Sequence, residues 1–114
     1  MINEPFQFEA LPGRQESTRI YRLTGQLVLN TMFDLQNELQ KEHPALTIFD
    51  ISGVPYMDSA GLGVLMNCHV SASRRDGKVV VAGASNRILD LFKITRVDSV
   101  FTMTPTVEEA EALA

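Results

Sequence analysis

An α/β fold with a largely parallel sheet is predicted by two observations on the 114-residue chain. First, short apolar segments of strand length alternate with segments whose apolar residues recur at helical spacing. Second, glycine and proline are spread evenly instead of gathering into a linker, and no repeat divides the chain. Alternating strands and helices imply crossover connections and parallel pairing, with the first strand free to pair antiparallel at an edge. We therefore predict a single domain over 1–114, with a small mixed sheet of about four or five strands and about four helices, in the order β-β-α-β-α-β-α-β-α.

Two short strands open the predicted order, and a third follows the first helix. Segments 6–10 (FQFEA) and 18–27 (TRIYRLTGQL) carry β-branched and aromatic residues on either side of a polar loop. Gly25 is expected to end the second strand. Segment 45–52 (ALTIFDIS) is almost continuously apolar, which is typical of a strand covered on both faces.

The first helix is predicted within 30–44 (NTMFDLQNELQKEHP). Asn30 belongs to the residue types that cap helix starts, and Pro44 cannot continue a helix, so we expect these two residues to bound it. The apolar residues at helical spacing are Met32, Leu35 and Leu39.

The second helix is predicted to begin in the stretch 57–65 (MDSAGLGVL) and to run to Arg75. Its apolar side comprises Leu62, Leu65, Met66, His69 and Ala72. The basic segment 74–78 (RRDGK) is typical of a last helical turn, where cations complement the helix dipole and Gly77 takes the left-handed cap.

The following part of the chain supplies two strands with a helix between them. The strands are expected at 78–83 (KVVVAG) and 99–103 (SVFTM), and the helix at 85–95 (SNRILDLFKIT) is capped by Ser85. Its inward residues are Ile88, Leu89 and Phe92.

A last helix is predicted in the tail, with two possible starts. Either Thr104 caps it with Pro105 in the first turn, or Thr106 and Glu109 form a capping box.

Charge and cysteine content narrow the function classes. The formal net charge is −4, so the long-range field opposes binding to nucleic acid or to an anionic membrane. Cys68 is the only cysteine, which excludes an internal disulfide and a thiolate-rich metal site. The start MINEPFQFEA has no basic region before an apolar core, and no apolar run reaches the roughly 20 residues of a membrane-spanning helix. We expect a cytoplasmic protein without membrane insertion.

The stretch 57–65 carries the strongest candidate site. It follows the third strand, and the functional residues of such sheets lie at the carboxyl ends of the strands. Asp58 can cap the helix by accepting hydrogen bonds from the free N–H groups of the first turn. Ser59 would lie in that turn, where the positive end of the helix dipole favours an anion such as phosphate. Gly61 and Gly63 leave the backbone uncovered and indicate close approach by another molecule, because two glycines weaken a helix.

Ser59 has no suitable general base to activate it as a catalytic nucleophile. Only His43 and His69 are available, and His69 lies ten positions along the same helix, about 15 Å away. The G-x-S-x-G elbow of serine hydrolases is missing as well. The GLG sequence is too short for a dinucleotide motif, and no phosphate-loop lysine follows it. We therefore predict no catalytic residue, no cofactor and no metal ligand.

The segments TIFDISGVPYMDSAGLGVLMN and GKVVVAGASNRILDLFKIT together resemble the STAS domain of bacterial anti-sigma factor antagonists, the switches of sporulation and general-stress regulation. In these antagonists an aspartate-serine pair before a small residue and Gly-Leu-Gly marks the regulated serine. That pattern falls on Ser59, with Asp58 beside it and Asp50 in the preceding strand. The implied fold, a small mixed sheet packed with helices, agrees with the predicted element order.

The resemblance implies partner switching by a protein that is not an enzyme. The unphosphorylated antagonist binds an anti-sigma factor that is often also a serine kinase. Phosphorylation of the serine ends the complex, and a PP2C-type phosphatase restores it. The implied phosphorylation site is Ser59, and the implied partner-binding residues are Asp58, Ser59, Ala60, Gly61, Leu62 and Gly63.

Two features depart from the family pattern. An acidic pair that is common in a G-E-x-D sequence after the second strand is replaced by Gln26 and Val28, and Ala60 replaces a second hydroxyl. Gln26 and Val28 are compatible with an alternative function, an accessory STAS subunit that braces the ATPase of an ABC-type lipid transport complex without a phosphorylation cycle. A serine hydrolase would instead show esterase activity that is lost in Ser59→Ala.

Overall fold

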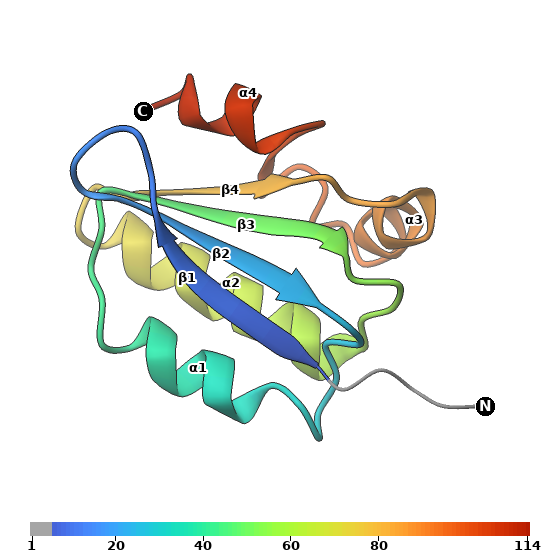
Figure 1. Ribbon diagram of the computed structural model, residues 1–114. Coiled ribbons are helices and arrows are strands. Elements are labelled where there is room, and N and C mark those ends of the chain that lie inside the picture. The colour runs from blue at the N-terminus through green and yellow to red at the C-terminus, as the bar shows by residue number, and fades with distance from the viewer. Residues whose placement is uncertain (1–5) are drawn as a thin grey trace.

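Five strands form one mixed sheet in the order β1-β2-β3-β4-β5, in a computed structural model that describes residues 6–114 (Figure 1). The strands are β1 (Gln7–Pro12), β2 (Thr18–Thr24), β3 (Leu46–Gly53), β4 (Lys78–Ala82) and β5 (Thr102–Thr104). β1 pairs antiparallel with β2, and all other neighbours pair parallel. The segment MINEPFQFEA, in which the sequence shows no secretory pattern, covers residues 1–10. Its first five residues lie outside the described part of the chain.

Four helices pack around this sheet. They are α1 (Phe33–Leu39), α2 (Ser59–Ser73), α3 (Asn86–Ile94) and α4 (Val107–Glu111). Figure 1 shows α1 and α2 on one face of the sheet, α4 on the other face, and α3 beyond the end of β4. Within 6–114, no helix has both the length and the apolar character needed to cross a membrane.

The core has two layers because side chains alternate between the faces of each central strand. Tyr21 and Phe49 join Leu65 of α2 in the larger apolar cluster. Ile48, next to Phe49, joins Ala110 of α4 in the smaller cluster on the opposite face. The prediction that the third strand is covered on both faces is therefore confirmed.

The predicted element order is confirmed, together with several of its boundaries. β2 ends at Thr24, and Gly25 has a φ of 90°, a left-handed conformation that glycine adopts without steric cost. The Ser85 side chain accepts from the N–H of Ile88 and caps α3. Thr106, and not Thr104, caps α4, since its hydroxyl accepts from the N–H of Glu109 at 3.2 Å.

The predicted start and end of the first helix are wrong. α1 begins at Phe33, and its N-cap residue Met32 makes no side-chain capping bond. Asn30 lies in the preceding loop, where the Thr31 hydroxyl donates to the carbonyl of Gln26 and thereby holds the chain in a turn before the helix starts. The helix also ends at Leu39, well before Pro44.

The predicted cap of the second helix is also wrong. Asp76, and not Gly77, adopts the left-handed conformation, with a φ of 59°. Aspartate tolerates this region better than most side chains do. Gly77 instead donates its N–H to the carbonyl of Ala72 at 2.7 Å, and its lack of a side chain lets it pack beside Ala72 and Ala45. The fifth strand is likewise shifted, because it covers Thr102–Thr104 and not 99–103.

Candidate functional site

Ser59 lies at the start of α2, where the loop after β3 meets the loop after β2. The two loops are joined by a parallel bridge between Leu27 and Met57 and by a hydrogen bond from the N–H of Leu27 to the carbonyl of Tyr56. Ser59 is exposed and occupies the first turn of the helix. The chain thus presents the hydroxyl at the surface on a backbone that is fixed from both sides.

Asp58 holds the two loops together with its carboxylate. One oxygen accepts from the N–H of Gly61 at 2.9 Å and caps α2. The other accepts from the N–H of Leu29 at 3.1 Å. The predicted capping role of Asp58 is confirmed. No sequence pattern indicates the second bond, because Leu29 is brought near only by the fold.

The N–H groups of Ser59 and Ala60 have no hydrogen-bond partner among residues 6–114. The N–H of Gly61 is bound by the Asp58 side chain, and the N–H of Leu62 by the Asp58 carbonyl. Two donors at the positive end of the helix dipole therefore remain beside the Ser59 hydroxyl.

The two glycines of the motif differ in their surroundings. Gly61 is buried, and a Cβ there would overlap the carbonyl oxygen of Leu27, so the molecule that approaches this glycine is the chain itself. Leu62 is buried in the larger cluster. Gly61 and Leu62 are therefore largely covered by the chain itself, and their role in partner binding stays a prediction. Gly63 has open space around it and remains available.

The loop that carries Gln26 and Val28 in place of the acidic pair is held by Thr31. The Thr31 hydroxyl donates to the carbonyl of Gln26 at 2.8 Å and accepts from the N–H of Val28 at 3.0 Å. The side chains of Gln26 and Val28 are both half-buried. The loop beside Asp58 is thus ordered by hydroxyl and backbone contacts, without carboxylates.

Asp50 does not belong to the surface around Ser59. Its neighbours Phe49 and Ile51 pack in the cluster on the α1 and α2 face, so the Asp50 side chain lies on the opposite face. There it accepts from the N–H and the hydroxyl of Ser52, at 3.1 and 2.7 Å, and lies 3.6 Å from Arg22. Asp50 closes a local turn on the α4 side of the sheet.

A hollow of about 510 Å³ separates Ser59 from α3. Arg87 lies over the Tyr56 ring at its edge, with 5.3 Å between the guanidinium carbon and the ring centroid. Ile94 borders the same hollow and is 80% exposed, which is unusual for a large aliphatic side chain. We call the exposed and half-buried residues around this hollow the Ser59 surface: Tyr56, Asp58, Ser59, Arg87, Asp90, Leu91 and Ile94.

Sequence reasoning missed the part of the Ser59 surface that comes from α3. The register of that helix contained a signal, because a helix whose inward residues are Ile88 and Phe92 turns Ile94 outward. The position of Arg87 near Ser59 had no such signal, since it depends on how α3 packs beyond β4.

Both histidines lie away from Ser59. His69 is ten residues along α2 and packs edge-on against Phe101, with the ring centroids 5.9 Å apart. His43 lies in the loop after α1 and lines a different pocket. Within the described part of the chain, no group of three or more His, Cys, Asp or Glu residues could hold a metal ion.

Comparison with known protein families identifies the family of this chain. The model of the STAS domain matches residues 12–110. The chain belongs to the STAS domain family. The matched residues include the whole of β2, the motif at the start of α2, and Arg87 and Ile94 of α3.

Individual relatives extend the comparison. The anti-sigma-B factor antagonist of Listeria monocytogenes is 44% identical over 46 residues, which cover 40% of this chain and 40% of the relative. An anti-sigma factor antagonist from Mycobacterium paratuberculosis has a similar structure, with a TM-score of 0.79, 19% identity, and coverage of 98% of this chain and 97% of that one.

Two structures of the Bacillus protein SpoIIAA, one unphosphorylated and one phosphorylated, are similar to this structure. Its unphosphorylated form gives a TM-score of 0.72 at 20% identity, over 95% of this chain and 94% of that one. Its phosphorylated form gives 0.70 at 19% identity, over 92% of this chain and 95% of that one. At these identities the structural likeness shows the shared fold.

Proposed function

We propose that this STAS domain is an anti-sigma factor antagonist that is switched off by phosphorylation of Ser59. Unphosphorylated protein binds an anti-sigma factor with serine kinase activity through the Ser59 surface and frees the sigma factor in the cytoplasm. The kinase then phosphorylates Ser59 and ends the complex, and a PP2C-type phosphatase restores the binding form.

The observation that carries the proposal is the exposed Ser59 hydroxyl in the first turn of α2, on a backbone fixed by Asp58. A kinase needs an accessible hydroxyl, and a partner needs a surface of constant shape. The relatives' names support the same function, since the Listeria protein and the mycobacterial structure are both anti-sigma factor antagonists.

The Ser59 surface has the composition of a protein-binding site. Tyr56 and Ile94 supply exposed aromatic and aliphatic area, and Arg87 supplies a cation over the Tyr56 ring. Aromatic residues and arginine carry much of the binding energy in protein interfaces. Ala60 and Gly63 add small residues along the same helix, so a partner can approach the α2 backbone closely.

Phosphate on Ser59 would alter binding through charge. A phosphoserine adds about −1.5 to −2 charges at pH 7, next to the carboxylate of Asp58. The free N–H groups of Ser59 and Ala60 and the nearby Arg87 can hold this anion, so the fold survives. A partner surface shaped for a neutral hydroxyl would instead bury an unpaired charge.

The test combines phosphate mapping with binding measurements. The protein is incubated with ATP and an anti-sigma factor that has serine kinase activity, taken from the same genome, and the phosphate is located by mass spectrometry. Calorimetry then measures binding of the kinase to the wild type, Ser59→Ala and Ser59→Asp. We expect phosphate on Ser59, binding retained in Ser59→Ala, and affinity reduced by about two orders of magnitude in Ser59→Asp, equivalent to about 3 kcal/mol.

Ser73→Asp is the matched control, because Ser73 is an exposed serine at the other end of α2 and its substitution adds the same charge. Binding should be unaffected by Ser73→Asp. Phosphate at another residue, or equal binding by Ser59→Ala and Ser59→Asp, would overturn the proposal. Equal binding without phosphate would favour an accessory STAS subunit that binds an ATPase with no phosphorylation cycle.

A further inference from the structure

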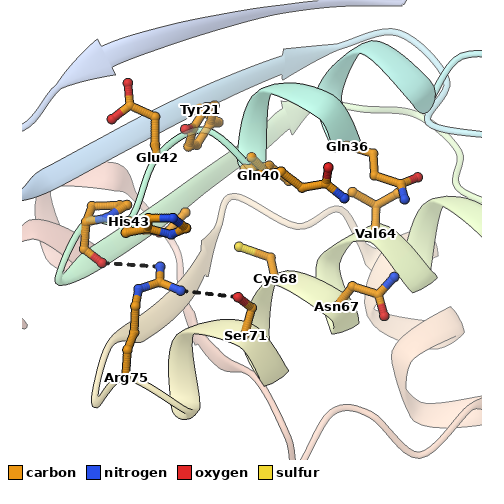
Figure 2. Close-up of a pocket in the computed structure, with 13 residues that line it drawn as sticks. Tyr21, Gln36, Gln40, Glu42, His43, Val64, Asn67, Cys68, Ser71 and Arg75 are labelled. Carbon is orange, nitrogen blue, oxygen red and sulfur yellow. Dashed lines mark hydrogen bonds between the residues drawn. The ribbon is translucent and has the colours of Figure 1, made fainter.

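A second pocket lies between α1 and the C-terminal half of α2, and it shares no residue with the Ser59 surface (Figure 2). Its volume is about 330 Å³, near the lower end of the range for small-molecule sites. Leu39 and Val64 form apolar parts of its wall. Figure 2 shows Arg75 and Ser71 on the α2 side and Tyr21 and Glu42 on the other side.

Tyr21 brings an unused hydroxyl to this pocket. The residue is fully buried, its ring packs on Phe49 with 5.8 Å between the centroids, and its hydroxyl has no hydrogen-bond partner in the structure. A buried hydroxyl without a partner costs free energy, so proteins rarely keep one without a reason. Burial, reinforced by the negative charge of Glu42, raises the pKa of Tyr21 to about 12, so the hydroxyl stays protonated and can donate.

Arg75 brings a second unused donor. Its two terminal nitrogens donate to the hydroxyl of Ser71 at 3.3 Å and to the carbonyl of Pro44 at 3.5 Å, which hold the guanidinium in place. Its Nε is buried and has no partner in the structure. No carboxylate among residues 6–114 pairs with Arg75, and Glu42, which lines the same pocket, is paired with Arg19 at 3.0 Å.

The remaining groups set the charge that the pocket prefers. Burial raises the pKa of the Cys68 thiol to about 11, so this side chain is neutral at physiological pH. The Glu42 charge is balanced by Arg19. The pocket therefore offers the Arg75 cation and the neutral Tyr21 donor on opposite sides. Leu39 and Val64 contribute apolar lining, and His43 lies between the two donors in the view of Figure 2.

We propose that this pocket binds a small carboxylic acid that carries a second oxygen acceptor at the far end of a short apolar body. The carboxylate lies on Arg75, because guanidinium groups bind carboxylates through charge-assisted hydrogen bonds. The second oxygen accepts from the Tyr21 hydroxyl. The ligand thereby satisfies both donors that have no partner among residues 6–114.

The probes are straight-chain keto acids with two, three or four methylenes between the carboxylate and the ketone. They are titrated into the isotope-labelled protein and followed by NMR of the backbone amides. We expect saturable shifts at Leu39, Val64 and Cys68 with at least one chain length, and none at Ser59. The fatty acid of equal length and the corresponding neutral keto amide should each bind at least tenfold more weakly.

Tyr21→Phe and Arg75→Met test the two donors, and Arg74→Met is the matched control, since Arg74 is an exposed arginine next to Arg75. Affinity should fall at least tenfold in Tyr21→Phe and Arg75→Met and stay unchanged in Arg74→Met. Thermal unfolding of the free protein shows that each variant is folded, and Tyr21→Phe should not lower the melting temperature.

Two outcomes would overturn the proposal. One is that no keto acid in the series binds saturably at millimolar concentration, which would mean that water satisfies the two donors. The other is binding that neither Tyr21→Phe nor Arg75→Met weakens. Both outcomes are independent of the phosphorylation of Ser59, because the pocket contains no residue of that surface.

Discussion

Gly61 and Gly63 lie two residues apart in α2, yet substitution should affect them in opposite directions. A Cβ at Gly61 would overlap the carbonyl oxygen of Leu27, and this backbone is fixed, so Gly61→Ala should lower the free energy of unfolding by about 3 kcal/mol. Gly63 has open space around it, and Gly63→Ala should raise the free energy of unfolding by about 0.5–1 kcal/mol through helix propensity.

Urea unfolding of the two variants measures the difference. Similar free energies of unfolding for Gly61→Ala and Gly63→Ala would contradict the close contact between α2 and the loop after β2. The pair also separates stability from binding, because Gly63→Ala adds a methyl group near the Ser59 surface on a folded protein.

Tyr21 and Cys68 should make the protein sensitive to alkaline pH. Burial raises the pKa of Cys68 from 9.0 to about 11 and that of Tyr21 from 10.0 to about 12. Between these values the unfolded chain releases protons that the folded chain keeps, so the free energy of unfolding falls as pH rises from 9 towards 12. Well below pH 9 both groups are protonated in the folded and in the unfolded chain, so neither makes the free energy of unfolding depend on pH.

The variants Cys68→Ala and Tyr21→Phe show which of the two side chains causes the loss of stability at alkaline pH. Melting temperatures measured from pH 8 to 11 should fall less steeply in Cys68→Ala in the lower part of the range, and less steeply in Tyr21→Phe in the upper part. A wild-type protein with a flat profile over this range would show that neither group is held in its protonated form.

At the scale of secondary structure, the start of α2 should depend on Asp58 more than an ordinary helix start depends on its cap. Asp58→Ala removes the bond to Gly61 and also the bond to Leu29, and it should lower the free energy of unfolding by about 2 kcal/mol, the upper end for a cap. Ser85→Ala removes only the bond to Ile88 from α3 and should cost about 1 kcal/mol. Thermal unfolding compares the two variants, and an equal loss would mean that the bond to Leu29 contributes nothing.

Helix and strand boundaries show how far local sequence patterns are informative. The caps at Asp58 and Ser85 were predictable, because each side chain bonds an N–H only three residues ahead. The start of α1 was not, because Asn30 is held in a loop whose shape depends on Thr31 and the neighbouring backbone. Capping residues are recognisable when their bonds are local, and they mislead when a tertiary turn displaces the helix start.

At the scale of the whole molecule, the protection of backbone amides should follow the sheet. β3 has partners on both sides, and Thr47, Ile48 and Phe49 are fully buried, so their amides should exchange only through global unfolding. β5 has three residues and a single partner strand, and its amides should exchange faster. Hydrogen exchange followed by NMR checks this order, and equal rates in β3 and β5 would contradict it.

The candidate sites differ in how much of each was predictable. Asp58 and Ser59 follow each other in the sequence, so their shared position at a helix start could be inferred from a local pattern. Tyr21 and Arg75 line the same pocket only because α2 packs against the sheet and ends near the loop after α1. No pattern in the sequence marks such a pair, since each residue alone is ordinary for its strand or helix.

The strand order β1-β2-β3-β4-β5 has a consequence for the kind of binding that this fold supports. In doubly wound sheets the order reverses at one point, and successive connections leave on opposite faces and open a crevice there. Here each strand lies beside the one that precedes it in the chain, so the strand order runs across the sheet without a reversal. The carboxyl edge of the sheet is consequently covered by the loops around Met57 and Leu27, so recognition at that edge takes place above these loops, in the open hollow between the start of α2 and α3.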